Sequence, residues 1–256
     1  MCKTSRQFGG PATPGYSVAH DPLLLLAMKR FYTAVTVAPS DDDWSVTLDG
    51  KPVRTPARAV LTVPNHALAT AIAGEWTAQD DRLRPETMPL TGFAYAAIDR
   101  ISPDVSEFAD GLAAFAATEL LAYRAEGPAA LVAAQAAGWD PLLVWARARY
   151  DVAFTVTSGI VHVAQPPATL AQITAAFRAF DALALAALHP VVTICGSAVI
   201  GLAVAERYLA ADAAFAAGQL DELWQAEQWG SDPLAAASLA NRRAALGDAV
   251  RLLDLL

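Results

Sequence analysis

Three carboxylates occupy helical stripes that are otherwise apolar, and of all the side chains in this sequence they are the best suited to acid–base chemistry. Glu75 shares its stripe with Leu68 and Ile72, because residues three or four apart lie on one face of a helix. Glu119 and Glu227 are placed in the same way among apolar neighbours. Burying a carboxylate costs several kcal/mol unless it is paired or hydrogen-bonded, so each of the three needs an explanation.

Two interpretations of these carboxylates are open. In the first, two of them have raised pKa values and work as acid and base of a hydrolase or isomerase, in a cleft between two domains. In the second, each meets an arginine, a tyrosine hydroxyl or a helix N-terminus. The candidate arginines are Arg82, Arg84, Arg100 and Arg124. No nucleophile, metal or cofactor motif accompanies the acids, which favours the second interpretation and predicts no catalytic residues.

Motifs for metals and phosphates are absent from the sequence. No two of its four histidines have the helical spacing of a zinc site, and Cys2 and Cys195 are far apart. Neither the glycine-rich phosphate loop that ends in Lys-Ser or Lys-Thr nor the Gly-x-Ser-x-Gly elbow of hydrolases occurs. We therefore expect neither a bound metal nor a cofactor.

The segment from residue 220 to 230 combines acids with two tryptophans. Read as a helix, it places Glu227 with Leu223 and Trp224 on an apolar stripe, while Glu222 and Trp229 lie on the opposite face. A tryptophan where solvent is expected indicates a surface that binds a partner. The alternative is that Trp229 folds back and packs on the last helix.

Composition sets the protein class. The chain has 256 residues, 55% of them hydrophobic, which is enough for one large domain and a small one. The formal net charge is -8, and an acidic balance argues against nucleic acid as a partner. Two distant cysteines imply no disulfide framework, so a reducing compartment is expected.

Neither the N-terminal segment nor the most apolar stretch of the sequence predicts a membrane protein. Residues 1–28 contain Gly9-Gly10-Pro11 and Pro14-Gly15 and indicate a loose leader without a secretory pattern. The most apolar stretch, residues 191–205, is interrupted by glycine and hydroxyl residues and is shorter than the roughly 20 residues that a span needs. It is interpreted as a buried helix, and no stable membrane insertion is expected.

Residues 29–65 have the pattern of a small antiparallel β domain. β-branched residues with a short period predict strands over residues 31–37, 44–48 and 60–63. Asp49-Gly50 is typical of a type I′ hairpin turn, and Pro52 places the returning strand at an edge.

Residues 66–256 predict a larger, mainly helical domain, so the fold class is α+β. Asn65 is a candidate N-cap, and the stretch from residue 83 to 90, with two prolines, is expected to be irregular. A short β hairpin is expected near residues 152–163. The predicted helices span residues 66–79, 91–100, 102–124, 129–150, 167–187, 190–210, 213–229 and 233–255.

Several motifs, in order along nearly the whole chain after the leader, resemble the assembly chaperone of the F1 sector of ATP synthase that binds the α subunit. Each motif alone has little specificity, whereas the ordered set is specific. The motifs are Arg30-Phe31-Tyr32, Leu48 to Pro56, Glu75 to Gln79, Met88 to Thr91 with Ile98-Asp99, Glu119 to Arg124, Gly138 to Pro141 and Gln225 to Gly230.

This resemblance implies a small β domain joined to a helical domain and a function without catalysis. Proteins of this family hold the free α subunit until the β subunit replaces it, which protects an exposed interface. The family's acidic C-terminal region implies Glu222, Glu227 and Trp229 as partner-binding residues, with a weaker inference for Glu75 and Trp76. After Trp-Gly this chain continues with Ser-Asp-Pro-Leu where the family usually has more acids and a histidine.

The resemblance also implies where the protein works. A bacterial cytoplasm or a mitochondrial matrix fits, and a leader poor in arginine favours the cytoplasm. The expected partner is the F1 α subunit, and the free protein is expected to be a monomer. The hydrolase or isomerase with carboxylates in a cleft is the alternative.

Overall fold

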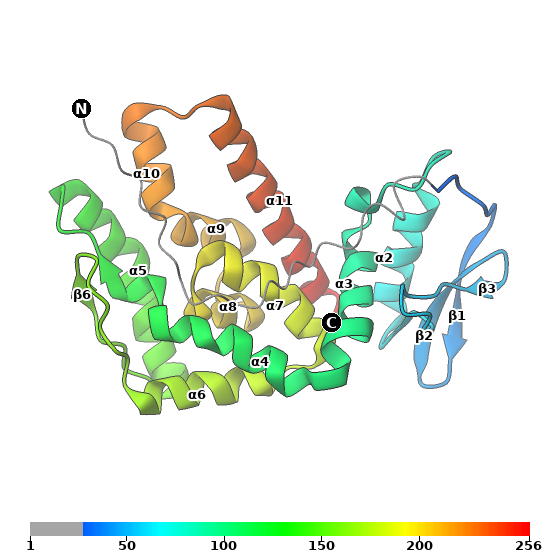
Figure 1. Cartoon of the computed structure of the whole chain (residues 1–256), viewed down its shortest axis with the longest axis horizontal. Coiled ribbons are helices and arrows are strands. Elements are labelled where there is room, and N and C mark those ends of the chain that lie inside the picture. Colours follow the sequence, from blue (N-terminus) through cyan, green and yellow to red (C-terminus); the bar gives the residue numbers. More distant parts are fainter. Residues whose placement is uncertain (1–27) are drawn as a thin grey trace.

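The computed structural model describes residues 28–256 and has a β-sheet at one end of an otherwise helical body (Figure 1). Strands precede helices along the chain, so the predicted α+β class is confirmed. The predicted leader lies outside the described residues, apart from Met28. The division into two domains at residue 65 stays a prediction.

The sheet is antiparallel and is centred on β2. The strands are β1 (Val35–Ser40), β2 (Asp43–Leu48), β3 (Lys51–Pro52) and β4 (Thr62–Val63). β2 pairs with β1 on one side and with both β3 and β4 on the other. Asp49 and Gly50 join β2 to β3 with φ of +47° and +79°. This confirms the predicted hairpin, because a type I′ turn needs positive φ at both central residues.

The first strand begins later than predicted. Residues 31–34 were expected to be part of it, but β1 begins at Val35. The Asp49 carboxylate accepts hydrogen bonds from the backbone N–H of Thr33 and of Ala34, at 3.1 and 2.8 Å. These bonds use N–H groups that a strand would offer to a neighbour, so the preceding residues form a strap beside the sheet.

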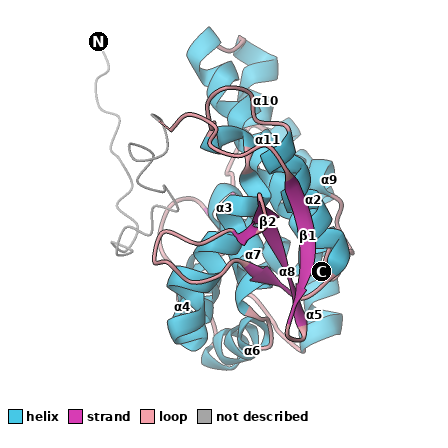
Figure 2. Cartoon of the chain, turned by 90° about the vertical axis from the view of Figure 1, so that its right-hand side faces the viewer, coloured by secondary structure: helices cyan, strands magenta, loops and turns pink. Residues whose placement is uncertain are grey.

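Two helices share a core with the sheet: the first packs directly against the strands, and the second packs on the first (Figure 2). They are α2 (His66–Thr77) and α3 (Pro89–Ala96). Asn65 caps α2 as predicted, accepting from the Leu68 N–H at 2.8 Å. Its amide also donates to the Leu255 carbonyl at 2.7 Å, which ties this part of the molecule to the end of the chain.

The remaining helices form a larger core around α7 and α8 (Figure 1). Their buried faces are rich in alanine and valine, which allow close helix packing. The bounds are α4 (Val105–Ala113), α5 (Ala129–Tyr150), α6 (Pro167–Arg178), α7 (Ala182–Cys195), α8 (Ala198–Ala205), α9 (Ala211–Gly218), α10 (Leu220–Trp229) and α11 (Pro233–Asp254). Short 3-10 turns cover Pro85–Thr87, Ser102–Asp104, Ala114–Thr118 and Leu120–Ala122, and a π-helical turn covers Ala97–Ile101.

The long helix predicted over residues 102–124 is wrong. α4 ends at Ala113, a 3-10 segment follows, and Glu119 has an extended backbone at φ -52° and ψ 118°. The Glu119 side chain turns inward at this point and hydrogen-bonds to backbone N–H groups. A polar side chain that finds its partners inside the core therefore interrupts a continuous helical pattern.

The hairpin predicted near residues 152–163 is also wrong. This segment contributes one short strand, β6 (Thr157–Ser158), which pairs in parallel with β5 (Tyr123–Arg124). Two parallel strands cannot be joined by a tight turn, so the partner of β6 comes from a distant part of the chain. The local pattern of β-branched residues around a glycine therefore did not predict this pairing.

Three helix boundaries differ from the prediction in the centre of the chain. Pro190 lies inside α7 and does not begin a helix. Asp181 caps α7, and Gly196, at φ +63°, ends it. Ser197 then caps α8 by accepting from the Ile200 N–H at 2.9 Å. A similar break at Gln219 divides the helix predicted over residues 213–229 into α9 and α10.

One described helix, α5, is long and apolar enough to cross a membrane by length and composition alone. Its buried residues include Gln135 and Trp139, and the Trp139 indole N–H donates to the Ala217 carbonyl at 2.9 Å. Asp140 on the same helix forms an ion pair with Arg124. These contacts are those of a helix packed against protein.

Candidate functional site

Glu75 is a buried carboxylate that caps the N-terminus of α3. Its two oxygens accept hydrogen bonds from the Leu90 N–H, the Thr91 N–H and the Thr91 hydroxyl, at 2.7 to 2.8 Å. Burial raises the pKa of this carboxyl group, and the three hydrogen bonds oppose the rise. Because both oxygens are occupied inside the protein, Glu75 offers a partner little surface.

Trp76, the next residue, lies between the sheet and α3. Its ring is 5.7 Å from that of Tyr32, whose hydroxyl donates to the Trp76 carbonyl at 2.7 Å. The indole nitrogen is buried and has no hydrogen-bond partner among the described residues. Buried polar atoms of this kind are uncommon in folded proteins, so the surroundings of Trp76 are of functional interest.

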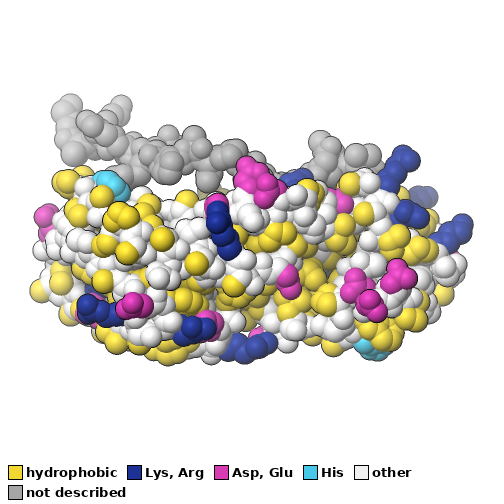
Figure 3. Space-filling view, turned by 90° about the horizontal axis from the view of Figure 1, so that it is seen from below, with side chains coloured by type: hydrophobic (Ala, Val, Ile, Leu, Met, Phe, Trp, Pro, Cys, Tyr) yellow, Lys and Arg dark blue, Asp and Glu magenta, His cyan; other side chains and the backbone are white. Residues whose placement is uncertain are grey.

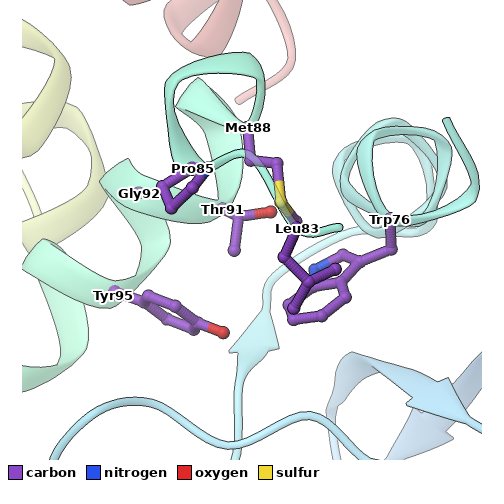
Figure 4. Close-up of a pocket in the computed structure, with 7 residues that line it drawn as sticks. All are labelled: Trp76, Leu83, Pro85, Met88, Thr91, Gly92 and Tyr95. Atoms are coloured by element: carbon purple, nitrogen blue, oxygen red, sulfur yellow. The ribbon is translucent and has the colours of Figure 1, made fainter. Parts of the chain in front are cut away.

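A small pocket lies on one side of Trp76 (Figure 4). The figure shows the indole nitrogen turned toward Leu83 and Met88, with Tyr95 on the opposite wall. The interior is about 20 Å³, which is room for little more than one water molecule. This pocket is too small for a substrate.

Glu119 is fully buried and caps the N-terminus of α8. Its oxygens accept from the Leu121 N–H at 3.4 Å and from the Val199 N–H at 3.2 Å, and Ser197 is a further partner. Burial raises the pKa of Glu119 to about 7, against the effect of these hydrogen bonds.

The carboxylates on apolar stripes therefore have a structural explanation. Glu75 and Glu119 each occupy a helix N-terminus, as one of the two interpretations predicted, and the proposed arginine partners were wrong for both. They cap different helices, next to different cores. No carboxylate lines the small pocket beside Trp76. No arrangement of two acids around a common point is present among these residues.

The prediction for α10 was partly wrong. Glu227 is exposed and does not lie on a buried stripe, and α10 has no buried residue at all. Trp229 is 73% exposed, as one interpretation predicted, and does not pack on the last helix as a core residue would. Trp224 touches it edge to face, with ring centres 5.6 Å apart.

Arg242 of α11 fixes the base of α10. Its guanidinium donates to both oxygens of Glu222 at 2.7 Å and to the side-chain oxygen of Gln219 at 2.5 Å. A single guanidinium nitrogen, Nη2, reaches both carboxylate oxygens, and this charge-assisted contact restrains both side chains. Arg242 and Glu222 are twenty residues apart, and no local sequence signal indicates their pairing.

The connection between α10 and α11 presents apolar side chains to solvent. Gly230, at φ +78°, ends α10, and Asp232 caps α11 by accepting from the N–H groups of Leu234 and Ala235. Leu234 is 83% exposed. We call the surface of Trp224, Glu227, Trp229 and Leu234 the α10–α11 tip. It combines an exposed aromatic, an exposed aliphatic side chain and a carboxylate.

Within residues 28–256, no group of three or more His, Cys, Asp or Glu side chains is placed to hold a metal ion.

Known proteins resemble this chain in sequence and in structure. The family model described as ATP12 chaperone protein matches residues 29–147. The mitochondrial protein atp12 of Schizosaccharomyces pombe is 24% identical over 234 residues, with 83% of this chain and 77% of that protein covered.

Two solved bacterial structures share the fold. The crystal structure of Atp12 from Paracoccus denitrificans has a TM-score of 0.85 and 41% sequence identity, and covers 89% of this chain and 97% of its own. The Atu1473 protein of Agrobacterium tumefaciens has a TM-score of 0.84 and 39% identity, and covers 88% of this chain and 85% of its own.

Proposed function

This chain belongs to the ATP12 chaperone protein family, and from that premise we propose that it assists assembly of the F1 sector of ATP synthase by binding the unassembled α subunit. It covers an interface surface of the α subunit until the β subunit replaces it. The α10–α11 tip makes the direct contact.

The exposure of Trp229 is the observation that supports this proposal most. A soluble protein gains nothing in stability from a tryptophan that is 73% exposed, whereas tryptophan is enriched where interfaces concentrate their binding energy. Leu234 is a second exposed apolar side chain near the end of α10, and Glu227, also exposed on α10, supplies a negative charge.

The other predicted partner-binding residues have supporting roles in this proposal. Glu222 holds α10 against α11 through Arg242 and so positions Trp229. Glu75 fixes α3 relative to α2, and thereby positions the Trp76 side chain at the small pocket.

Function of this kind needs no covalent chemistry. The chaperone and the β subunit compete for one surface, and release follows when the true partner binds more tightly. We propose that the protein is not an enzyme, is a monomer when free, and works in a bacterial cytoplasm or, in a eukaryote, in the mitochondrial matrix.

Binding to separately purified α and β subunits tests the proposal. We expect the wild-type protein to bind the free α subunit and not the free β subunit. Trp229→Ala should weaken α-subunit binding by about 30-fold or more, because removing a central aromatic at an interface costs at least about 2 kcal/mol. Glu227→Lys should weaken it less, as a change at the rim. Calorimetry measures both affinities.

Two control variants distinguish the loss of a direct contact from a general effect on folding. Val144→Ala removes another exposed apolar side chain, and Glu107→Lys reverses another exposed carboxylate on α4; both should bind like the wild type. If Trp229→Ala binds the α subunit as tightly as Val144→Ala does, the tip is not the contact surface. If the wild type ignores the α subunit, the proposed function is wrong.

A further inference from the structure

A second candidate binding site lies beside the sheet. It includes no residue of the α10–α11 tip. It is a hollow of about 420 Å³ between the strap before β1 and the start of β3, within the size range of ligand pockets. Its lining includes the aromatic side chains of Phe31, Tyr32 and Trp76 and the cations Lys51 and Arg54. We call it the β-domain hollow.

The strap that bears Phe31 is held rigidly. The Arg30 guanidinium donates to the carbonyls of Tyr32 and Gln79 at 3.1 and 2.6 Å and lies over the Tyr32 ring. Asp49 accepts from the Ala34 N–H and from the hydroxyl and N–H of Thr33, and these hydrogen bonds lower the pKa of the Asp49 carboxyl group. Phe31 is nevertheless 61% exposed. A rigid strap that presents an aromatic side chain to solvent is preorganised for binding.

Trp76 forms a wall of both hollows on this side of the molecule. Its side chain is 5% exposed, and its indole N–H has no partner among residues 28–256. The indole N–H faces Leu83 and Met88 in the small pocket (Figure 4), so Trp76 contributes its ring, and no hydrogen bond, to the β-domain hollow.

The two cations of the β-domain hollow, Lys51 and Arg54, share its lining with one carboxylate, Asp49. The oxygens of Asp49 accept hydrogen bonds from Thr33 and Ala34. Neither Lys51 nor Arg54 takes part in an ion pair within the described part of the chain. Residues 50–74 contain three basic side chains and no acidic one, in a chain of net charge -8. Figure 3 shows Lys and Arg side chains gathered at the end of the molecule where Figure 1 places the sheet, with a separate acidic group nearby.

We propose that the β-domain hollow binds an extended segment of the unassembled α subunit that carries a carboxylate next to a large apolar side chain. The apolar side chain packs against the three aromatic side chains of the hollow, and the carboxylate pairs with Lys51 and Arg54. This inference rests on the proposed function and adds a second contact to the one at the α10–α11 tip.

An extended segment fits this site better than a folded surface does. The hollow admits one or two side chains, and an unassembled subunit exposes segments that its partner later covers. Two weak contacts on one partner also raise each other's effective concentration, so a chaperone with two sites holds its client firmly and still releases it stepwise.

Charge reversal at the rim tests the electrostatic part of this proposal. Lys51→Glu and Arg54→Glu should each weaken binding of the free α subunit by about tenfold at low salt, and the loss should shrink at high salt because exposed charges are screened. Arg147→Glu, an exposed arginine on α5, is the matched control and should bind like the wild type. Thermal unfolding confirms that all three variants are folded.

A crosslink at Phe31 tests the location. With a photoreactive phenylalanine analogue at position 31, we expect crosslinks to one α-subunit segment that contains an acidic residue beside apolar ones. The same analogue at Ile160, which is also exposed, should give none to that segment. Mass spectrometry identifies the linked peptide.

The outcomes separate the two proposals. If the wild type binds the α subunit but both rim variants bind equally well and Phe31 gives no specific crosslink, the hollow is not a docking site, while the proposed function stands. If the wild type does not bind the α subunit, both proposals fall. Loss of binding in the rim variants with retention in Arg147→Glu supports the hollow.

Discussion

Two buried glutamates stabilise the packing of helices in the same way. Glu75 and Glu119 each place a carboxylate at the first turn of a helix distant in sequence, where unpaired N–H groups and the helix dipole favour negative charge. A side chain on one element thereby fixes the position of another. The energetic effect differs between the two, because Glu119 is fully buried and is the one whose pKa rises to about 7.

This pKa shift predicts how stability depends on pH. The folded protein retains the Glu119 proton up to about pH 7, while the unfolded chain loses it near 4.5. Folding is therefore favoured by this group below pH 4.5, and its contribution is lost as the pH rises to 7. At 1.36 kcal/mol per pH unit, the loss amounts to about 3 kcal/mol.

Comparison of the wild type with Glu119→Gln isolates this contribution. Between pH 5 and pH 8 the free energy of unfolding of the wild type should fall by about 2 to 3 kcal/mol relative to the variant. Urea unfolding at several pH values measures it, and all other titrating groups cancel in the difference. A difference that stays constant over this range would show that Glu119 does not titrate there.

At the level of elements, the β2–β3 turn shows how one local signal determines a structure. Gly50 has φ +79°, and nothing lies within 4 Å of where its Cβ would be. Gly50→Ala should therefore lower the free energy of unfolding by about 1 kcal/mol through backbone strain alone.

Gly74 provides the matched control for this prediction. It lies within α2, also has free space around its Cβ position, and has no left-handed φ. Gly74→Ala should raise stability by about 0.5 to 1 kcal/mol, because alanine is the better helix former. Opposite signs for the two variants in denaturant unfolding are expected, and equal signs would contradict the role given to the turn.

Over the whole molecule, α7 and α11 connect the two cores. Ala187 of α7 and Leu252 of α11 belong to the core beside the sheet, although most buried residues of these helices belong to the larger core. Asn65 adds its hydrogen bond to Leu255. The sheet end and the helical body are therefore expected to unfold together.

Leu252→Ala tests this coupling. Leu252 is fully buried, so its removal should cost about 2 to 5 kcal/mol. If the coupling is strong, far-ultraviolet circular dichroism and tryptophan fluorescence should lose signal in a single shared transition, at a lower denaturant concentration than in the wild type. Two separate transitions in the wild type would show that the ends are independent.

Sequence alone determined the features that depend on neighbouring residues. The Asp49-Gly50 turn, the Asn65 cap and the order of strands before helices all follow from signals within a few positions. The exposed face of Trp229 was also readable, because a helical period places it opposite Leu223. The family resemblance rests on short motifs of the same kind.

Only the tertiary structure decided where the polar groups find partners. Glu75 reaches a backbone N–H 15 residues away and Glu119 reaches one 80 residues away, and Arg242 meets Glu222 across 20. The β-domain hollow likewise joins the strap, β3 and α2. Contacts at such separations depend on how whole elements pack, and the packing energy of the complete chain, rather than any local pattern, selects them.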